Sequence, residues 1–275
     1  MRVVIAAALV LISVAPPSAQ ESQADAARRK IFDQILDLNV RDGYVYYRAL
    51  KSGRAKLDGY VSQLARARVD QLARDERLAF WLNAYNALVL ETVIDHYPIQ
   101  ARSKEYPAKS IRQIPGAFER LVHPVAGRML TLDQIEQTVL TEFHDPRVYF
   151  ALGRGSVAGG RLRSEAFGPA MLEAQLTAVA AECAARPECV QVDRGADKLL
   201  VSAIFSWREK EFVAAYASGA PVRFSNRSPI ERAVITSIQP KLLTIEREAL
   251  DKNTFQMAYQ SYDWTLNDLT GRGGR

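Results

Sequence analysis

The sequence predicts an α+β fold, built as a helix-rich single domain with an antiparallel sheet. In several long segments apolar residues recur at steps of three and four, which is the spacing of an amphipathic helix. Shorter segments carry alternating patterns or turn residues that are typical of strands and hairpins. The 275 residues contain no internal repeat and no change of composition sharp enough to mark a linker. One domain is therefore the simplest account.

The first nineteen residues predict a secretory signal peptide. Arg2 precedes an uncharged stretch at 3–14, and two prolines and small residues follow up to Ala19. A membrane anchor is the rival interpretation, but this apolar stretch is shorter than the roughly 20 residues that a spanning helix needs. No later segment is apolar enough to span a membrane. We therefore expect an exported protein, periplasmic or secreted, without a membrane span.

The charge of the chain is mildly basic. Lys and Arg number 36 against 31 Asp and Glu, for a formal net charge of +5, and removal of the signal peptide, which holds one Arg and no acid, leaves +4. Basic and acidic residues alternate along the chain without a run of five like charges. This pattern is typical of solvated surfaces, so we expect no nucleic-acid partner.

The N-terminal third is expected to begin with a short helix and a turn. We divide the chain into the signal peptide, a flexible leader at 20–29, the domain at 30–268 and a flexible tail at 269–275. Apolar residues predict a first helix over 31–38. Asp42-Gly43 predicts a turn, followed by the short strand YVYY.

The strongest helix is predicted from Asp75 to His96, where apolar residues recur at steps of three and four and Pro98 lies just beyond the end. Within it, Asn83 and Asn86 form a polar notch on an otherwise apolar segment. Asparagine is a poor helix former because its amide competes for backbone hydrogen bonds. We favour two satisfied core amides that fix an adjoining loop over direct ligand binding.

The middle of the chain predicts a hairpin that turns at Ala126-Gly127, then a helix that opens at Thr131 with a capping-box spacing to Gln134. A strand over 148–152 is expected to lead into a glycine-rich loop, and a helix to restart after Gly168-Pro169.

The C-terminal third predicts a hairpin, or a strand leading into a helix, over 189–205, and a helix over 207–216. Two further helices are expected to begin at Ser228-Pro229 and Thr244, and a terminal strand is expected over 255–264.

Cys183 and Cys189 are the only cysteines of the chain. Because export leads to an oxidising compartment, we expect a disulfide between them. Two buried free thiols are the alternative, and a redox role is a weaker one.

The tract from Asp145 to Phe167 has the architecture of a site, because an apolar run ends in a loop rich in glycine and arginine. A phosphate-cradling loop is one interpretation. However, the nucleotide fingerprints do not fit, and the residues around Ser156 do not form a nucleophile elbow. The residues we predict to bind a ligand are Gly153, Arg154, Gly155, Ser156, Arg161, Asn83 and Asn86.

The three histidines do not predict a metal centre. His96, His123 and His144 lie far from one another and from the cysteines, and the spacing of metal ligands is absent. We expect no metal and no cofactor.

Several segments together resemble a known family. In order and spacing, the chain resembles the family called domain of unknown function 547 through FWLNAYNALVLETVIDHYPI, SIRQI, LVHPVAGRMLTLDQIE, DPRVYFAL, RLRSEAF, IFSWREKEF and YDWTLND. The resemblance covers roughly residues 30–268, and FWLNAYNA is its most specific part. It implies a core similar to those of papain-like and transglutaminase-like thiol enzymes.

The resemblance also implies a catalytic cysteine in the loop, a histidine in the strand before it and another histidine in the preceding helix. In this sequence Arg154 stands at the position of the cysteine, Tyr149 at that of the strand histidine and Gln137 at that of the helix histidine. Arginine is not a nucleophile, and tyrosine and glutamine are not bases near neutral pH. Other family positions keep their residues, namely Trp81, Asn83, Tyr85, Asn86, Trp207 and Trp264.

Our first hypothesis is therefore an exported, non-catalytic member whose pocket binds a small anionic ligand or an envelope protein. The alternative is a hydrolase or acyltransferase with a relocated centre, in which Ser156 works with His123 or His144. A purely structural role in an envelope assembly is the third hypothesis, and it predicts an exposed apolar patch.

Overall fold

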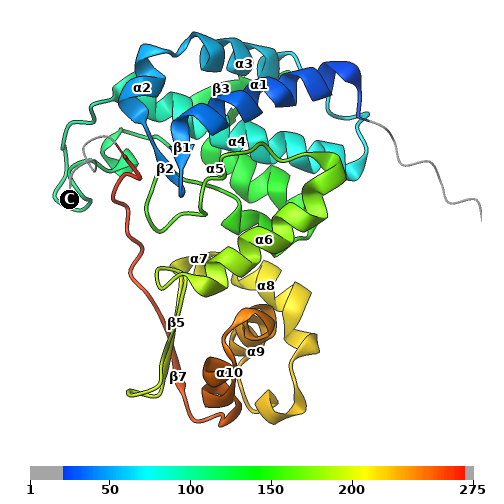
Figure 1. Cartoon of the computed structure of the whole chain (residues 1–275), viewed down its shortest axis with the longest axis vertical. Coiled ribbons are helices and arrows are strands. Elements are labelled where there is room, and N and C mark those ends of the chain that lie inside the picture. Colours follow the sequence, from blue (N-terminus) through cyan, green and yellow to red (C-terminus); the bar gives the residue numbers. More distant parts are fainter. Residues whose placement is uncertain (1–20, 270–275) are drawn as a thin grey trace, which may run out of the picture.

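The computed structural model describes residues 21–269, and it confirms an α+β fold rich in helices. The predicted signal peptide and nearly all of the predicted tail lie outside the described residues. Four helices gather in the upper part of Figure 1, namely α1 Gln23–Asn39, α2 Tyr47–Ser52, α3 Ala55–Ala65 and α4 Arg74–His96. A small sheet and the last helices form the lower part, and α6 Leu172–Ala185 lies between the two parts.

The helix α4 is the centre of the hydrophobic core. The structure confirms the predicted helix, which begins one residue before Asp75. The Glu76 carboxylate accepts the backbone N–H of Ala73 at 3.1 Å, which satisfies one of the free donors at the start of the helix. From Leu78 to Leu90 every side chain is buried. A helix that is buried on all sides must be covered by other elements, and α1, α2, α3 and the segment after the central hairpin contact it.

Two hairpins have the turns that the sequence predicts. Strands β1 Val40–Arg41 and β2 Tyr44–Val45 pair antiparallel, as do β3 Val122–Val125 and β4 Arg128–Thr131. In each hairpin both turn residues have positive φ, with 51° and 81° in the first and 52° and 69° in the second. This conformation matches the twist of the paired strands, and a glycine at the second turn position adopts it without strain.

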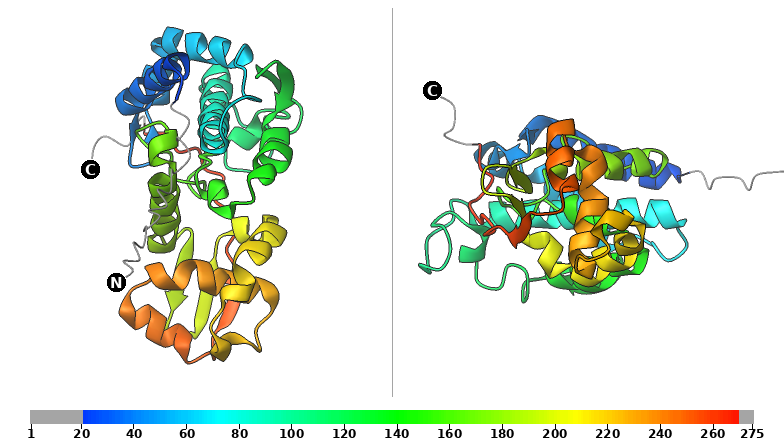
Figure 2. Two further views of the ribbon diagram at one scale, coloured as in Figure 1. Left: turned by 90° about the vertical axis from the view of Figure 1, so that its right-hand side faces the viewer. Right: turned by 90° about the horizontal axis from the view of Figure 1, so that it is seen from below.

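The lower part contains a three-stranded sheet in the order β5–β6–β7 (Figure 2). Strands β5 Val190–Asp193 and β6 Lys198–Val201 form the predicted hairpin, whereas β7 Gln256–Tyr259 runs parallel to β6. A parallel neighbour requires a long crossover. Four helices supply it, namely α7 Ala203–Trp207, α8 Glu209–Tyr216, α9 Pro229–Ile238 and α10 Thr244–Asp251, of which the last three lie on one side of the sheet.

The strand predicted over 148–152 is wrong, because this segment is the 3-10 helix η4 Pro146–Phe150. The Asp145 carboxylate accepts the backbone N–H of Arg147 at 3.0 Å, and Pro146 follows at the first helical position. Both features start a helical turn. A short apolar run does not distinguish a strand from a buried helical turn, so the error has a physical origin.

The predicted leader is also different, since α1 already begins at Gln23. The Ser22 hydroxyl accepts the backbone N–H of Asp25, and Arg29 forms an ion pair with Glu21. These contacts order a segment that composition alone marks as polar and flexible.

Other elements are present but have different bounds from those predicted. The terminal strand is limited to β7, and the strand after the first turn is limited to β2 because α2 begins at Tyr47. The helix that Thr131 opens has the predicted capping box, but it continues as three short pieces, α5 Leu132–Gln134, the π-helix η2 Ile135–Val139 and the 3-10 helix η3 Leu140–Phe143.

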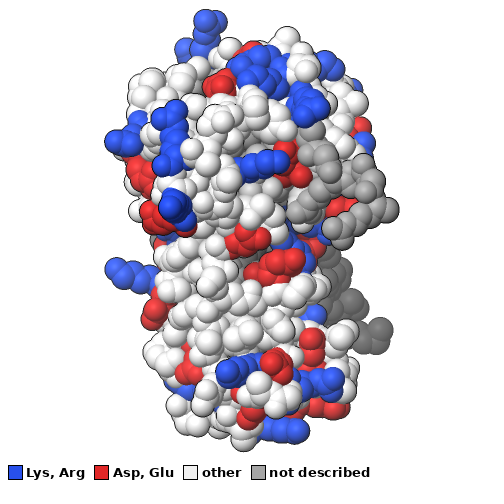
Figure 3. Space-filling model, turned by 90° about the vertical axis from the view of Figure 1, so that its left-hand side faces the viewer, with Lys and Arg blue, Asp and Glu red and all other residues white. Residues whose placement is uncertain are grey.

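Charges are mixed over the surface. On the face drawn in Figure 3, Lys and Arg side chains are interspersed with Asp and Glu. Among residues 21–269, no helix combines the length and the apolar character needed to cross a membrane.

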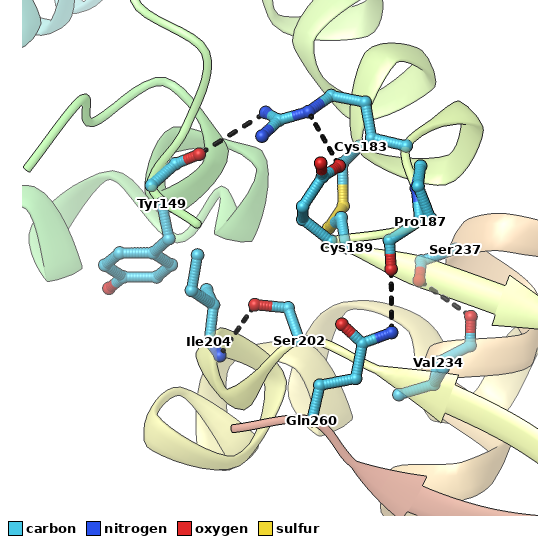
Figure 4. Close-up of a disulfide and its surroundings, with 12 residues drawn as sticks. Tyr149, Cys183, Pro187, Cys189, Ser202, Ile204, Val234, Ser237 and Gln260 are labelled. Atoms are coloured by element: carbon cyan, nitrogen blue, oxygen red, sulfur yellow. Dashed lines mark hydrogen bonds and ion pairs between the residues drawn. A yellow bond between two sulfur atoms is a disulfide. The ribbon is translucent and has the colours of Figure 1, made fainter. Parts of the chain in front are cut away.

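The predicted disulfide between Cys183 and Cys189 is present, with Cα atoms 5.2 Å apart (Figure 4). It joins the end of α6 to the residue before β5 and so fixes the reversal of the chain. Next to it, the Gln260 side chain donates to the Pro187 carbonyl at 2.8 Å and links the segment after β7 to the same corner.

We expect the double substitution Cys183→Ala/Cys189→Ala to lower the free energy of unfolding by about 2 kcal/mol, because a seven-residue closed loop removes little entropy from the unfolded chain. Urea denaturation of the oxidised protein, the reduced protein and the variant measures this. Equal stability of all three would contradict it.

Candidate functional site

The two predicted asparagines of α4 hold both ends of the glycine loop, residues 151–167. At the start of the loop, the Asn86 amide donates to the Ala151 carbonyl at 3.0 Å and accepts the Gly153 N–H at 2.9 Å. At its end, the Asn83 amide donates to the Phe167 carbonyl and accepts the N–H of the same residue, both at 2.8 Å. The two side chains are thus satisfied core amides that fix an adjoining loop.

The glycine loop folds back on itself, and its backbone packs closely against neighbouring backbone. A Cβ at Gly160 would lie 2.0 Å from the Phe150 carbonyl oxygen, and a Cβ at Gly159 would lie 2.3 Å from that of Gly153. The backbone N–H groups of residues 156–160 all donate to carbonyls of the chain. These glycines therefore allow close backbone packing, and the amides at 156–160 are already used within the protein.

Arg154 points into the protein. Its side chain is buried, and its backbone has φ of 45°, in the left-handed region that non-glycine residues rarely adopt. The guanidinium donates to the Glu136 carboxylate from Nε at 3.1 Å and from Nη2 at 2.6 Å, and Nη1 donates to the Tyr149 carbonyl at 3.0 Å. Arg154 is therefore committed to internal partners.

Glu136 binds two arginines and a tyrosine. Besides Arg154, it accepts from Nη2 of Arg208 at 2.7 Å and from the Tyr85 hydroxyl at 3.2 Å. Burial by itself would raise the pKa of Glu136, but the charges and hydrogen bonds of Arg154 and Arg208 outweigh it and lower the pKa to about 2. The carboxylate is therefore ionised over the whole physiological range.

The three positions that the resemblance marks as catalytic are only partly brought together. Tyr149 lies in the same network as Arg154, and the guanidinium of Arg208 stacks on its ring at 4.6 Å. Burial raises the pKa of the Tyr149 hydroxyl, so this group does not act as a base near neutral pH. Gln137 follows Glu136 in the π-helix η2, but its side chain is exposed.

Ser156 is held by an aromatic cluster and not by an imidazole. Its hydroxyl lies 2.9 Å from that of Tyr262, whose ring packs against Trp207 and Trp264 with centroid distances of 4.7 and 4.4 Å. His123 and His144 are not partners of Ser156 among the described contacts. Nδ1 of His123 lies 4.0 Å from the Glu91 carboxylate, and His144 lines a different hollow.

One hollow opens beside the glycine loop, and we call it the loop hollow. It measures about 230 Å³ and includes Ser156, Gly159, Gly160 and Arg161 of the loop together with residues of the β1–β2 turn. Arg161 forms an ion pair with Asp42, and Arg186 on the same wall forms one with Glu188. Of the predicted binding residues, only Ser156 and Arg161 line this hollow.

Sequence reasoning did not single out Glu136, Arg208 and Tyr262. All three fall within segments that carry the family resemblance, DQIE, SWREKEF and YDW. Nothing in those segments signals that residues up to 126 positions apart share one buried network, because the pairing depends on the tertiary fold. Among residues 21–269, no group of three or more His, Cys, Asp and Glu side chains could hold a metal ion.

Comparison with known proteins gives one match. Residues 69–182 match the model of the family described as "Protein of unknown function, DUF547". No curated protein and no solved structure matches the chain. The similarity to papain-like and transglutaminase-like cores stays a prediction.

We expect Glu136→Gln to lower the free energy of unfolding at pH 7 by about 3–5 kcal/mol, because two buried guanidiniums lose their carboxylate. The pKa of Glu136 is below its unfolded value of 4.5. Its contribution is therefore complete above that value and is lost as the pH falls toward 2. Urea denaturation from pH 7 to pH 2 should show this loss in the wild type and a flatter profile in the variant.

Glu142→Gln is the matched control, because Glu142 is exposed on the neighbouring segment. Glu136→Gln and Glu142→Gln variants of equal stability would contradict the central role of Glu136.

We expect Asn86→Ala to cost about 1–3 kcal/mol of unfolding free energy, because the Ala151 carbonyl and the Gly153 N–H lose their partner. Asn86→Asp should cost at least as much, because it places a buried carboxylate without a counter-charge against the Ala151 carbonyl. Hydrogen exchange at Gly153 should accelerate in Asn86→Ala. Unchanged exchange would show that Asn86 does not hold the loop.

Proposed function

We propose that this chain, whose residues 69–182 match the DUF547 family model, is an exported, non-catalytic protein that binds a small ligand beside its glycine loop. Its centre is an internal ion-pair network in place of a thiol and its base.

The single observation that carries the proposal is the pairing of Arg154 with Glu136. At the position where the family resemblance implies a cysteine, a buried arginine donates two hydrogen bonds to a carboxylate. Burial opposes the charge of Arg154, but Glu136 outweighs it and holds the pKa above its usual value. A group that stays protonated and lacks a free lone pair neither attacks an acyl carbon nor accepts a proton.

Export rests on the N-terminal sequence pattern and on the disulfide. Structural disulfides persist in oxidising compartments and are rare in reducing ones, and the bridge between Cys183 and Cys189 fits that environment. We propose that residues 1–19 are removed and that the mature protein acts in the periplasm or outside the cell.

The ligand is proposed to bind in the loop hollow through an acidic group that reaches Arg161. The present partner of Arg161 is Asp42, whose side chain is 86% exposed. An exposed ion pair contributes only about 0–1 kcal/mol, so a carboxylate or phosphate of a ligand can replace Asp42 at small cost. The planar guanidinium can then form two parallel hydrogen bonds to the ligand.

The alternative is a hydrolase or acyltransferase that uses Ser156, and among residues 21–269 no imidazole or carboxylate is bonded to the Ser156 hydroxyl. The hydroxyl partner of Ser156 is Tyr262, and burial raises the pKa of that phenol. A protonated phenol does not take the proton of a serine hydroxyl.

We expect a fluorophosphonate probe to leave Ser156 unlabelled and the mature protein to hydrolyse p-nitrophenyl acetate no faster than its Ser156→Ala variant, because no general base adjoins the hydroxyl. Intact-mass spectrometry and release of nitrophenol measure these outcomes. Labelling at Ser156 that is lost in His123→Ala or His144→Ala would establish the hydrolase instead.

We expect small carboxylates or phosphates to raise the thermal midpoint of the mature protein. Arg161→Ala should abolish the part of this increase that comes from binding in the loop hollow. Asp42→Asn is the matched variant. It frees Arg161 from its internal partner and should strengthen binding. If neither substitution changes the shift, the anionic ligand of this hollow is disproved, while the absence of catalysis is judged by the preceding experiment alone.

A further inference from the structure

A second hollow, which we call the junction hollow, measures about 430 Å³ and lies where the start of α4, α6 and α8 approach the short helix η8 Gln239–Lys241. Its wall includes six titratable side chains, namely Arg74, His144, Asp145, Arg147, Tyr216 and Lys241. Three of them are permanent or near-permanent cations and only one is an acid. The hollow is separate from the glycine loop and shares none of its residues.

The balance of charge distinguishes the junction hollow from two other hollows of about 200 Å³ or more. In the loop hollow two arginines face two acids, Arg161 and Arg186 against Asp42 and Glu188. In the hollow of about 200 Å³ beside α10, three cations face three acids, Arg194, Lys198 and Lys252 against Asp193, Asp197 and Glu248. Of these three hollows, the junction hollow alone has more cationic than acidic side chains in its wall, and Glu173 and Asp75, which lie outside the wall, pair with Arg147 and Arg74.

Arg147 is a fixed part of the wall. Its guanidinium donates to the Asp145 carboxylate at 2.8 Å and to that of Glu173 at 2.7 and 2.8 Å. Two carboxylates more than neutralise one arginine, so Arg147 does not need a further anion. It is also too well bound to move away.

Unlike Arg147, Lys241 and Arg74 are not bound by two carboxylates. The ammonium of Lys241 donates to the Ser237 carbonyl at 2.5 Å, and no carboxylate lies within ion-pair distance of it in the described chain. Arg74 donates to the Phe143 carbonyl at 2.8 Å and has only an exposed ion pair with Asp75. Burial and the charge of Arg147 lower the pKa of Lys241, which is the expected response of a half-buried cation without a counter-charge.

We propose that the junction hollow binds a phosphomonoester group, with Lys241 and Arg74 as its main cationic partners. A phosphate carries up to two negative charges and three acceptor oxygens, which suits an ammonium, a guanidinium and the neighbouring hydroxyl of Tyr216. Bound phosphate would supply the counter-charge that Lys241 lacks. The hollow is larger than a phosphate ion, so it leaves room for an organic group.

The first test is titration of the mature protein with inorganic phosphate and with glycerol 3-phosphate by calorimetry. We expect binding of both, with tighter binding of the ester, and a loss of about tenfold or more in affinity in Lys241→Met and in Arg74→Met. Lys241→Met removes a half-buried cation and keeps the length of the side chain, so it should fold. Lys198→Met in the balanced hollow beside α10 is the control, and it should bind phosphate as the wild type does.

A further experiment distinguishes two possible sources of the phosphomonoester, a lipid headgroup and a free metabolite. Vesicles of phosphatidylcholine with phosphatidic acid test a lipid headgroup, and soluble glycerol 3-phosphate tests a free metabolite. Sedimentation with the vesicles that Lys241→Met abolishes would assign the lipid, whereas binding of the soluble ester alone would assign the free metabolite.

A second readout follows the lysine directly. An amine-acetylating reagent should label Lys241 faster than ordinary surface lysines, and phosphate should slow labelling of Lys241 but not of Lys252, as measured by peptide mass spectrometry. Phosphate affinity that is the same in Lys241→Met, or lowered equally by Lys198→Met, would overturn the proposal. So would labelling of Lys241 that phosphate does not change.

Discussion

The buried carboxylate of Glu136 is the constraint on which the centre of this protein depends. A carboxylate out of water is tolerated only when nearby charges and hydrogen bonds replace its solvation, and Arg154, Arg208 and Tyr85 do so. These three side chains come from the glycine loop, the end of α7 and α4. Arg154 has a left-handed backbone, and its guanidinium points inward to this acid. Loss of the acid would leave two cations buried without compensation.

The asparagines of α4 supply hydrogen-bond partners for buried backbone groups of the glycine loop. Backbone groups inside a helix are used by the helix itself, so α4 cannot pair with a neighbouring segment through its main chain. The side-chain amides of Asn83 and Asn86 take that role, since each offers one donor and one acceptor to a backbone unit of the loop. A loop without regular structure thereby has its buried polar groups satisfied. This explains why two poor helix formers lie inside the most buried helix.

Local features could be predicted from the sequence, and long-range ones could not. The extent of α4, the two hairpin turns, the capping box at Thr131 and the disulfide all follow from residues that are close in sequence. The strand predicted over 148–152 is wrong because burial, and not a period of two, determines the apolar character of this segment. The arginines and glycines of the loop are visible in the sequence, but the direction of Arg154 depends on Glu136, whose proximity only the tertiary fold creates. The cation-rich hollow was missed for the same reason, since its residues come from five separate elements.

The segment at 265–267 has no regular structure, but it covers one side of the glycine loop. The carbonyl of Thr265 accepts the N–H of Val157, Leu266 pairs with Ser156, and the Asn267 side chain bonds to Tyr47 and Gly43, so that this segment lies between β2 and the glycine loop. It is the last part of the domain to be synthesised, and it lies outside the matched region 69–182. A chain that emerges from the ribosome or crosses a membrane N-terminus first therefore cannot complete its centre until residues 265–267 have followed. Until then the glycine loop remains uncovered on one side, and the unfinished polypeptide is a natural substrate for chaperones and proteases.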